Sequence, residues 1–92
     1  MEHDSIHHPY HEVLVAYLRE LRVVRNLTQA EVAEQLNRPQ TYLSEIENRR
    51  RGLDMLQVRR LCEIYNFPFP DFVVELERRV AAVPKARRKP KA

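Results

Sequence analysis

The chain has 92 residues, which limits it to a single domain. Hydrophobic residues make up 43% and charged residues 32%, which is typical of a globular domain and not of a disordered chain. One glycine and six prolines argue against a fold of tight β-hairpins, no apolar run is long enough to span a membrane, and the N-terminus lacks a signal-peptide pattern. We therefore expect a cytoplasmic, all-α protein whose core is too small for a deep catalytic pocket.

The net charge of +3 is unevenly distributed. Residues 78–92 hold seven basic and no acidic residues, whereas residues 1–77 hold nine arginines against thirteen acidic residues, a net charge of −4. A high isoelectric point of this origin does not by itself indicate that the body binds nucleic acid. We expect residues 84–92 to form a basic disordered tail, which either only keeps the chain in solution or attracts DNA without sequence preference.

The chain before the first helix carries most of the histidines. Residues 1–8 are polar and show no periodicity, which predicts a flexible leader before a domain at residues 9–83. His7 and His11 lie one helical turn apart, but no cysteine or structured carboxylate accompanies them, and we expect no metal site. A lone Cys62 permits no disulfide within the chain and fits a small core residue.

Local signals then mark the helices in turn. Pro9 suits a first helical position, and the pairs Thr28/Glu31 and Asp54/Gln57 form capping boxes, in which each side chain satisfies a free amide of the other residue. Asparagines, which tolerate the left-handed conformation that ends many helices, follow three of the apolar patterns, at Asn26, Asn37 and Asn66. Together the patterns predict five helices, over residues 9–25, 28–36, 40–48, 54–65 and about 71–80.

Short polar side chains line the outward face of the helix expected over 40–48. A face that only meets water usually carries long charged side chains, whereas amide and hydroxyl groups suit the edges of bases. Glutamine can bind adenine with two hydrogen bonds, and glutamate can accept one from cytosine. We therefore predict that the base-contacting residues are Gln40, Thr41, Ser44 and Glu45.

Arginines flank the same helix at both ends. Residues 38–51 carry four arginines against two glutamates, although the body as a whole is acidic. Contacts to phosphate position a protein on DNA, and the amino end of the helix at 28–36 can also meet a phosphate. The predicted phosphate-contacting residues are Gln29, Arg38, Asn48, Arg49, Arg50 and Arg51.

Two motifs, T-Q-A-E-V-A at 28–33 and Q-T-Y-L-S-E-I-E at 40–47, occur in an order and spacing that carry a resemblance. From Leu18 to Leu76 the chain resembles the Xre/Cro/phage-repressor family of lambda repressor-like helix-turn-helix proteins. The resemblance implies a compact five-helix domain that inserts the helix at 40–48 into the major groove of double-stranded DNA. It also implies that Gln29 touches phosphate and supports the reading glutamine, Gln40.

The resemblance further implies an ion pair between Arg22 and Glu47, which would tie the first helix to the recognition helix. The chain departs from the family at the helix ends, where asparagine stands in place of the usual glycine. It also departs at Pro39, which stands in place of a common serine or threonine cap and removes a capping side chain.

The last helix carries more apolar surface than one short helix needs. We expect part of it to form a homodimer contact, with Phe69, Phe72, Val73 and Leu76 as candidates. Two recognition helices would then lie about 34 Å apart and read an inverted repeat. This predicts a transcriptional regulator, with repressor as the sign of action suggested by the resemblance.

A second class of function remains open. A protein of this fold that acts as an antitoxin would bind a toxin through the last helix or the tail, with DNA binding secondary. An enzyme would need a nucleophile with its base, or a metal cluster, and no set of such residues converges in the sequence. We expect no enzymatic activity and no cofactor.

Overall fold

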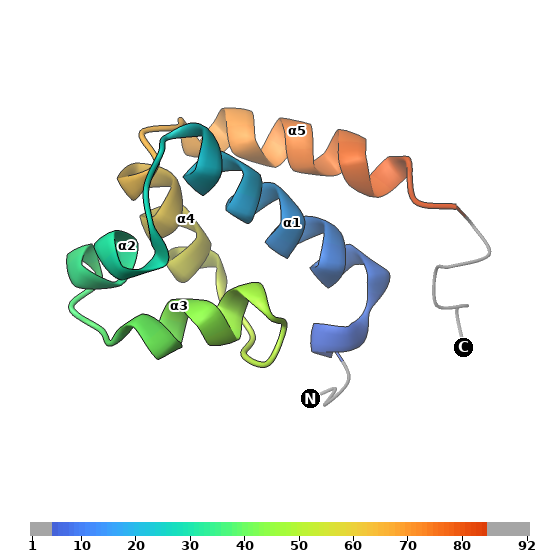
Figure 1. Cartoon of the computed structure of the whole chain (residues 1–92). Coiled ribbons are helices and arrows are strands. Elements are labelled where there is room, and N and C mark those ends of the chain that lie inside the picture. The colour runs from blue at the N-terminus through green and yellow to red at the C-terminus, as the bar shows by residue number, and fades with distance from the viewer. Residues whose placement is uncertain (1–4, 85–92) are drawn as a thin grey trace.

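The structure of the protein, a computed structural model, describes residues 5–84. This part of the chain is all-α, without strands, and its five helices form one compact domain with an additional 3-10 turn before them (Figure 1). The elements are η1 Ser5–His7, α1 Pro9–Val24, α2 Gln29–Gln35, α3 Gln40–Glu47, α4 Met55–Ile64 and α5 Phe69–Ala81. The five-helix prediction is confirmed. No helix in residues 5–84 is both long and apolar enough to cross a membrane.

Both capping boxes are present. The Thr28 hydroxyl accepts from the Glu31 amide at 3.1 Å, and the Glu31 carboxylate accepts from the Thr28 amide at 2.8 Å. At the start of α4, Asp54 and Gln57 make the same exchange at 2.8 and 2.7 Å. Pro39 precedes α3 without a side-chain cap, as its lack of a donor or acceptor group requires.

Four helices end in the same left-handed turn, and none of these turns uses glycine. Asn26, Asn37 and Asn66 have φ values of 61°, 58° and 56°, which confirms the prediction made for the asparagines. Arg49 adopts the same conformation after α3, with φ of 59°. In each turn the next amide reaches back to a carbonyl of the last helical turn; after α3, the Arg50 amide donates to the Glu45 carbonyl at 2.8 Å.

The two ends of the described chain differ from the expected boundaries. Residues 5–7, expected in a flexible leader, form η1, and Ile6 lies against Gly52 in the loop after α3. Helix α5 begins at Phe69, two residues before the expected Asp71, because the fixed φ of Pro70 suits a first helical turn. Residues 1–4, and the expected tail apart from Pro84, lie outside the described residues.

The core forms where α1, α4 and α5 meet the α2–α3 pair. Buried side chains of all five helices form it, and they include Tyr17, Val32, Leu43, Ile46, Leu61, Cys62 and Phe72. Burial raises the pKa of the Cys62 thiol to about 11, as expected of a core cysteine. The Phe72 ring is fully buried and stacks on Tyr17, with 4.7 Å between centroids. Phe72 is therefore a core residue, and this corrects its place among the dimer-contact candidates.

Candidate nucleic-acid interface

Helices α2 and α3 pack together and form one edge of the molecule (Figure 1). The connection between them is short, residues 36–39, and turns the chain sharply because Asn37 takes the left-handed conformation. Leu43 and Ile46 bury one face of α3 in the core. The opposite face of α3, with Gln40 and Thr41 at its start, is left on the surface.

A continuous chain of hydrogen bonds joins the start of α3 to α1. Gln40 Nε2 donates to Gln29 Oε1 at 3.0 Å, and Gln29 Nε2 donates to Glu47 Oε1 at 2.9 Å. Arg22 then donates to both carboxylate oxygens of Glu47, from Nε at 2.7 Å and from Nη2 at 3.0 Å. Four residues from three helices are thus held by direct side-chain contacts.

The chemistry of Glu47 fixes the direction of this chain. An ionised carboxylate only accepts, so Gln29 has to present its amide nitrogen to Glu47 and its carbonyl oxygen to Gln40. Gln40 must in turn donate to that oxygen. The result is that Gln40 keeps its own carbonyl oxygen and its second N–H for a partner outside the protein.

The Arg22–Glu47 pair is nearly enclosed. The two side chains are 11% and 6% exposed, and Arg22 Nη1 also donates to the Leu27 carbonyl at 2.8 Å. The hydrogen bonds with Glu47 raise the pKa of Arg22 despite its burial. Arg19 Nε lies 3.7 Å from Glu47 as a second, solvent-exposed cation. The pair implied by the family resemblance is thus present as a contact, and it fixes α3 against α1.

The remaining polar residues of α3 are not equally free. Ser44 Oγ accepts from Asn48 Nδ2 at 3.2 Å, so these two side chains are joined along the helix. Glu45 Oε1 accepts two hydrogen bonds from Arg51, at 2.8 and 3.1 Å. Glu45 was expected to contact bases and Arg51 to contact phosphate, yet in this structure each is the partner of the other. Neutralisation by Arg51 lowers the repulsion that the Glu45 charge would exert on a phosphate.

The four arginines near α3 have different surroundings. The guanidinium groups of Arg38 and Arg51 lie over the ring of Tyr42, at 5.1 and 4.8 Å from its centroid. Arg49 Nη1 lies 3.9 Å from Glu12 Oε1. Within residues 5–84, the Arg50 side chain alone among the four makes no hydrogen bond, ion pair or ring contact. Arg50 is therefore the most available of them for an external anion.

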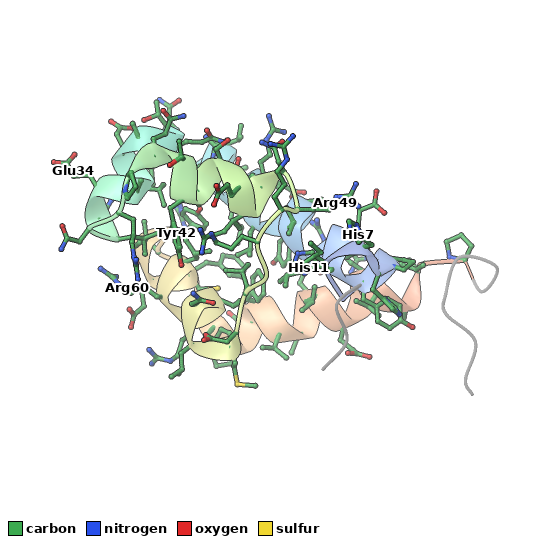
Figure 2. The ribbon with its side chains drawn as sticks, turned by 90° about the horizontal axis from the view of Figure 1, so that it is seen from below. His7, His11, Glu34, Tyr42, Arg49 and Arg60 are labelled. Atoms are coloured by element: carbon green, nitrogen blue, oxygen red, sulfur yellow. The ribbon has the colours of Figure 1, made fainter. Side chains whose placement is uncertain are left out.

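His11 connects this loop to the start of α1. Its Nε2 atom is buried and finds no hydrogen-bond partner among residues 5–84. Burial, and then the nearby charges of Arg49 and His7, lower the pKa of His11 (Figure 2 shows the three side chains near one another). The lowered pKa favours the neutral form of His11, which lies near Arg49 of the loop after α3.

Sequence reasoning did not identify Tyr42 or Gln57 as parts of this surface. Gln57 Nε2 donates to the Tyr42 hydroxyl at 2.9 Å and so links α4 to α3. The available signal was the spacing of Arg38 and Tyr42, which lie four residues apart around the start of a helix. The contact between Tyr42 and Arg51 crosses the end of α3, and no regular spacing in the sequence indicates it.

The dimer-contact candidates on α5 differ in how far they are exposed. Phe69 and Leu76 are half-buried and pack against the core, and Val73 is 45% exposed. Val74, which was not a candidate, is 71% exposed. Of the four candidates, Phe69, Val73 and Leu76 therefore keep accessible surface on this helix, and Phe72 does not.

Comparison with protein families identifies the domain. A search of curated proteins found no match. Residues 13–76, which span α1 to the middle of α5, match a family model described as a helix-turn-helix domain. This segment includes the α2–turn–α3 unit and every residue of the hydrogen-bond chain above. Since the match covers more than half of the chain, the protein belongs to the helix-turn-helix domain family of DNA-binding domains.

Proposed function

We propose that the protein is a sequence-specific transcriptional regulator, most similar in mode of action to the Xre and lambda repressor-like proteins. It inserts α3 into the major groove and represses from an operator that it reads as a homodimer. The single observation that carries the proposal is the directed hydrogen-bond chain ending at Gln40, with its links at 2.7–3.0 Å. Such a chain holds one surface amide in a fixed orientation, which a merely solvated glutamine does not need.

The free groups of Gln40 fit one base better than the others. Adenine presents an acceptor, N7, beside a donor, the N6 amino group, in the major groove. The remaining N–H of Gln40 complements N7, and its carbonyl oxygen complements N6. We therefore assign Gln40 to an adenine, with Thr41 and Ser44 near the neighbouring base pairs.

Contacts with phosphate set the register of α3 in the groove. Gln29 retains a second N–H, and the Arg50 side chain is directed to solvent without a partner in the described chain. Arg38, Asn48, Arg49 and Arg51 supply further donors around the same edge. This arrangement places donors at both ends of α3, as a helix lying across a groove between two phosphate backbones requires.

The apolar residues of α5 support a two-fold dimer. Phe69, Val73 and Leu76 follow one another at spacings of four and three residues, so they lie along one side of the helix. A pair of such stripes buries apolar surface on both copies, and two-fold symmetry sets two α3 helices about 34 Å apart. The operator expected from this geometry is an inverted repeat.

Selection from a pool of random duplexes, followed by titration of the enriched sequence, tests the proposal. We expect an inverted repeat with adenine at one symmetric position, and a loss of about 1–3 kcal/mol in binding when Gln40 is replaced in Gln40→Ala. Gln35→Ala is the matched control, because Gln35 is an exposed glutamine outside the hydrogen-bond chain.

Two outcomes contradict the proposal in different ways. Equal loss on the selected and on random duplexes would remove base reading from Gln40 and leave only a contact with the backbone. Selection without any enriched sequence would favour the alternative function, a module that binds a protein partner such as a toxin through α5.

A further inference from the structure

Tyr42 lies on the side of α3 that faces α4 (Figure 2). Two arginines from opposite ends of the helix converge on its ring. Arg38 comes from the turn before α3 and lies 5.1 Å from the ring centroid. Arg51 comes from the loop after α3 and lies 4.8 Å from it.

The ring itself is held in place. Tyr42 is half-buried, and its hydroxyl accepts a hydrogen bond from Gln57 Nε2 at 2.9 Å. Gln57 is fixed by the capping box of α4, in which it exchanges hydrogen bonds with Asp54. Tyr42 is therefore a rigid platform for two long side chains that would otherwise sample many rotamers in water.

The attraction between the ring and the arginines has a simple physical origin. The face of an aromatic ring carries partial negative charge and attracts a guanidinium, while the N–H groups at the edge of the guanidinium stay free to donate. An arginine held in this way retains its capacity to bind a phosphate with two parallel hydrogen bonds. It also loses less rotamer freedom on binding, which favours the complex.

The two arginines depend on Tyr42 to different degrees. Arg51 is also bound by Glu45 at 2.8 Å. In the part of the chain that the structure describes, Arg38 makes no ion pair. The ring is thus the main restraint on the Arg38 side chain and one of two restraints on Arg51.

We propose that Tyr42 is a positioning residue that preorganises Arg38 and Arg51 for the two phosphate backbones beside α3. Tyr42 acts through these arginines and makes no contact with bases. It therefore raises affinity for every DNA sequence and leaves the preference among sequences unchanged. The inference rests on the proposed DNA-binding function, since it assigns the arginines to a DNA ligand.

The first test compares Tyr42→Leu and Tyr42→Phe on the selected operator and on a random duplex of equal length. Tyr42→Leu keeps an apolar side chain but removes the ring, and two exposed cation–π contacts correspond to a loss of about fivefold in affinity. We expect that loss on both duplexes, with the ratio of the two affinities unchanged. Tyr42→Phe keeps the ring and should retain most of the affinity.

A second measurement separates positioning from a general structural effect. In a chain that already carries Arg38→Gln and Arg51→Gln, Tyr42→Leu should change affinity by less than twofold, because the groups through which Tyr42 acts are gone. A loss in this background as large as in the parent would overturn the inference. Arg59→Gln is the control background, since Arg59 pairs with Glu63 on α4 and does not contact Tyr42.

The outcomes distinguish the inference from the function on which it rests. If the parent binds no duplex, the proposed function fails and the inference fails with it. If the parent binds but Tyr42→Leu binds both duplexes equally well, only the inference fails. Thermal unfolding of each variant identifies any variant that has lost its fold. If Tyr42→Leu has lost its fold, the affinity of Tyr42→Phe and the measurements in the Arg38→Gln/Arg51→Gln background test the inference instead.

Discussion

Helix α1 is joined to its neighbours on two sides by arginine–glutamate pairs that look alike and differ in burial. Arg22 binds Glu47 of α3 through two hydrogen bonds of 2.7 and 3.0 Å. Two residues earlier, and so on nearly the opposite side of α1, Glu20 receives two hydrogen bonds of 2.9 and 3.1 Å from Arg79 of α5. The first pair is 11% and 6% exposed, and the second is 29% and 51% exposed.

The difference shows what burial does to the same chemical contact. On the α5 side, water screens the charges, and Arg79 has other partners in Glu75 at 2.7 Å and in the ring of Tyr17 at 4.1 Å. The hydrogen bonds with Glu20 and Glu75 raise the pKa of Arg79. Hydrogen bonds from Arg78 and then from Arg79 hold the pKa of Glu75 at about 2, well below its ordinary value. On the α3 side, Glu47 is enclosed and depends on Arg22. The contact between α1 and α3 therefore includes one enclosed ion pair, whereas the contact between α1 and α5 rests on several partly exposed interactions and on the packing of Phe72.

Arg22→Gln is the substitution for which we expect the largest loss of stability. It leaves the Glu47 carboxylate enclosed with only the solvent-exposed Arg19, 3.7 Å away, as a cation, and we expect a loss of about 3 kcal/mol in the free energy of unfolding. Urea denaturation followed by circular dichroism measures the loss. A change below about 1 kcal/mol would mean that Arg19 or water replaces Arg22, and that the pair is energetically a surface pair.

Arg79→Gln is the matched change on the other side of α1. We expect a loss of no more than about 1 kcal/mol in the free energy of unfolding, and less in high salt, because the pair is partly exposed. The same denaturation experiment at low and high salt measures both effects. A loss equal to that of Arg22→Gln would contradict the role given to burial.

Arg49→Gly tests the loop after α3, where Arg49 contacts Glu12 of α1. Because Arg49 has φ of 59°, where a Cβ atom is strained, we expect a gain of roughly 0.5 kcal/mol in stability after the higher chain entropy of glycine is subtracted. DNA affinity should fall at the same time, since a cation is lost. Arg50→Gly is the control: Arg50 lacks a positive φ, so it should lose affinity without any gain in stability. Reduced stability in Arg49→Gly would show that the contact with Glu12 outweighs the strain.

The smallest effect that we expect is that of His11→Gln, which changes how the free energy of unfolding depends on pH. The pKa of His11 in the folded chain is lowered from the ordinary 6.5, so the unfolded chain binds more protons than the folded chain as the pH falls through 6.5. The contribution of His11 to stability is therefore complete above that pH and is lost below it. Unfolding free energies at pH 7.5 and 5.5 should differ less in His11→Gln than in the parent. Equal differences in both would assign the pH dependence to other groups.

Sequence reasoning predicted the features that depend on neighbouring residues. The capping boxes at Thr28 and Asp54 and the turns at Asn26, Asn37 and Asn66 each follow from a few residues and the backbone conformation that they favour. The predicted start of α5 was two residues too late, because prolines at 68 and 70 are both compatible with a helix start.

Sequence reasoning did not predict the features that depend on how the helices cross. The sequence did not distinguish which of Phe69 and Phe72 is fully buried, because both lie on the same apolar stripe. The pairing of Glu45 with Arg51 crosses the end of α3, where no regular spacing applies. The docking of Ile6 near Gly52 brings together residues far apart in the chain and needs the whole fold to be known.

The hydrogen-bond chain from Arg22 to Gln40 also bears on the transfer of recognition helices between proteins. Gln29 lies on α2 and Arg22 on α1, so two of the three residues that orient Gln40 lie outside α3. A graft of residues 40–47 onto another scaffold would carry Gln40 but not the groups that fix the direction of its amide. Such a chimaera should bind with relaxed choice at that base until the equivalents of Arg22 and Gln29 are grafted with the helix.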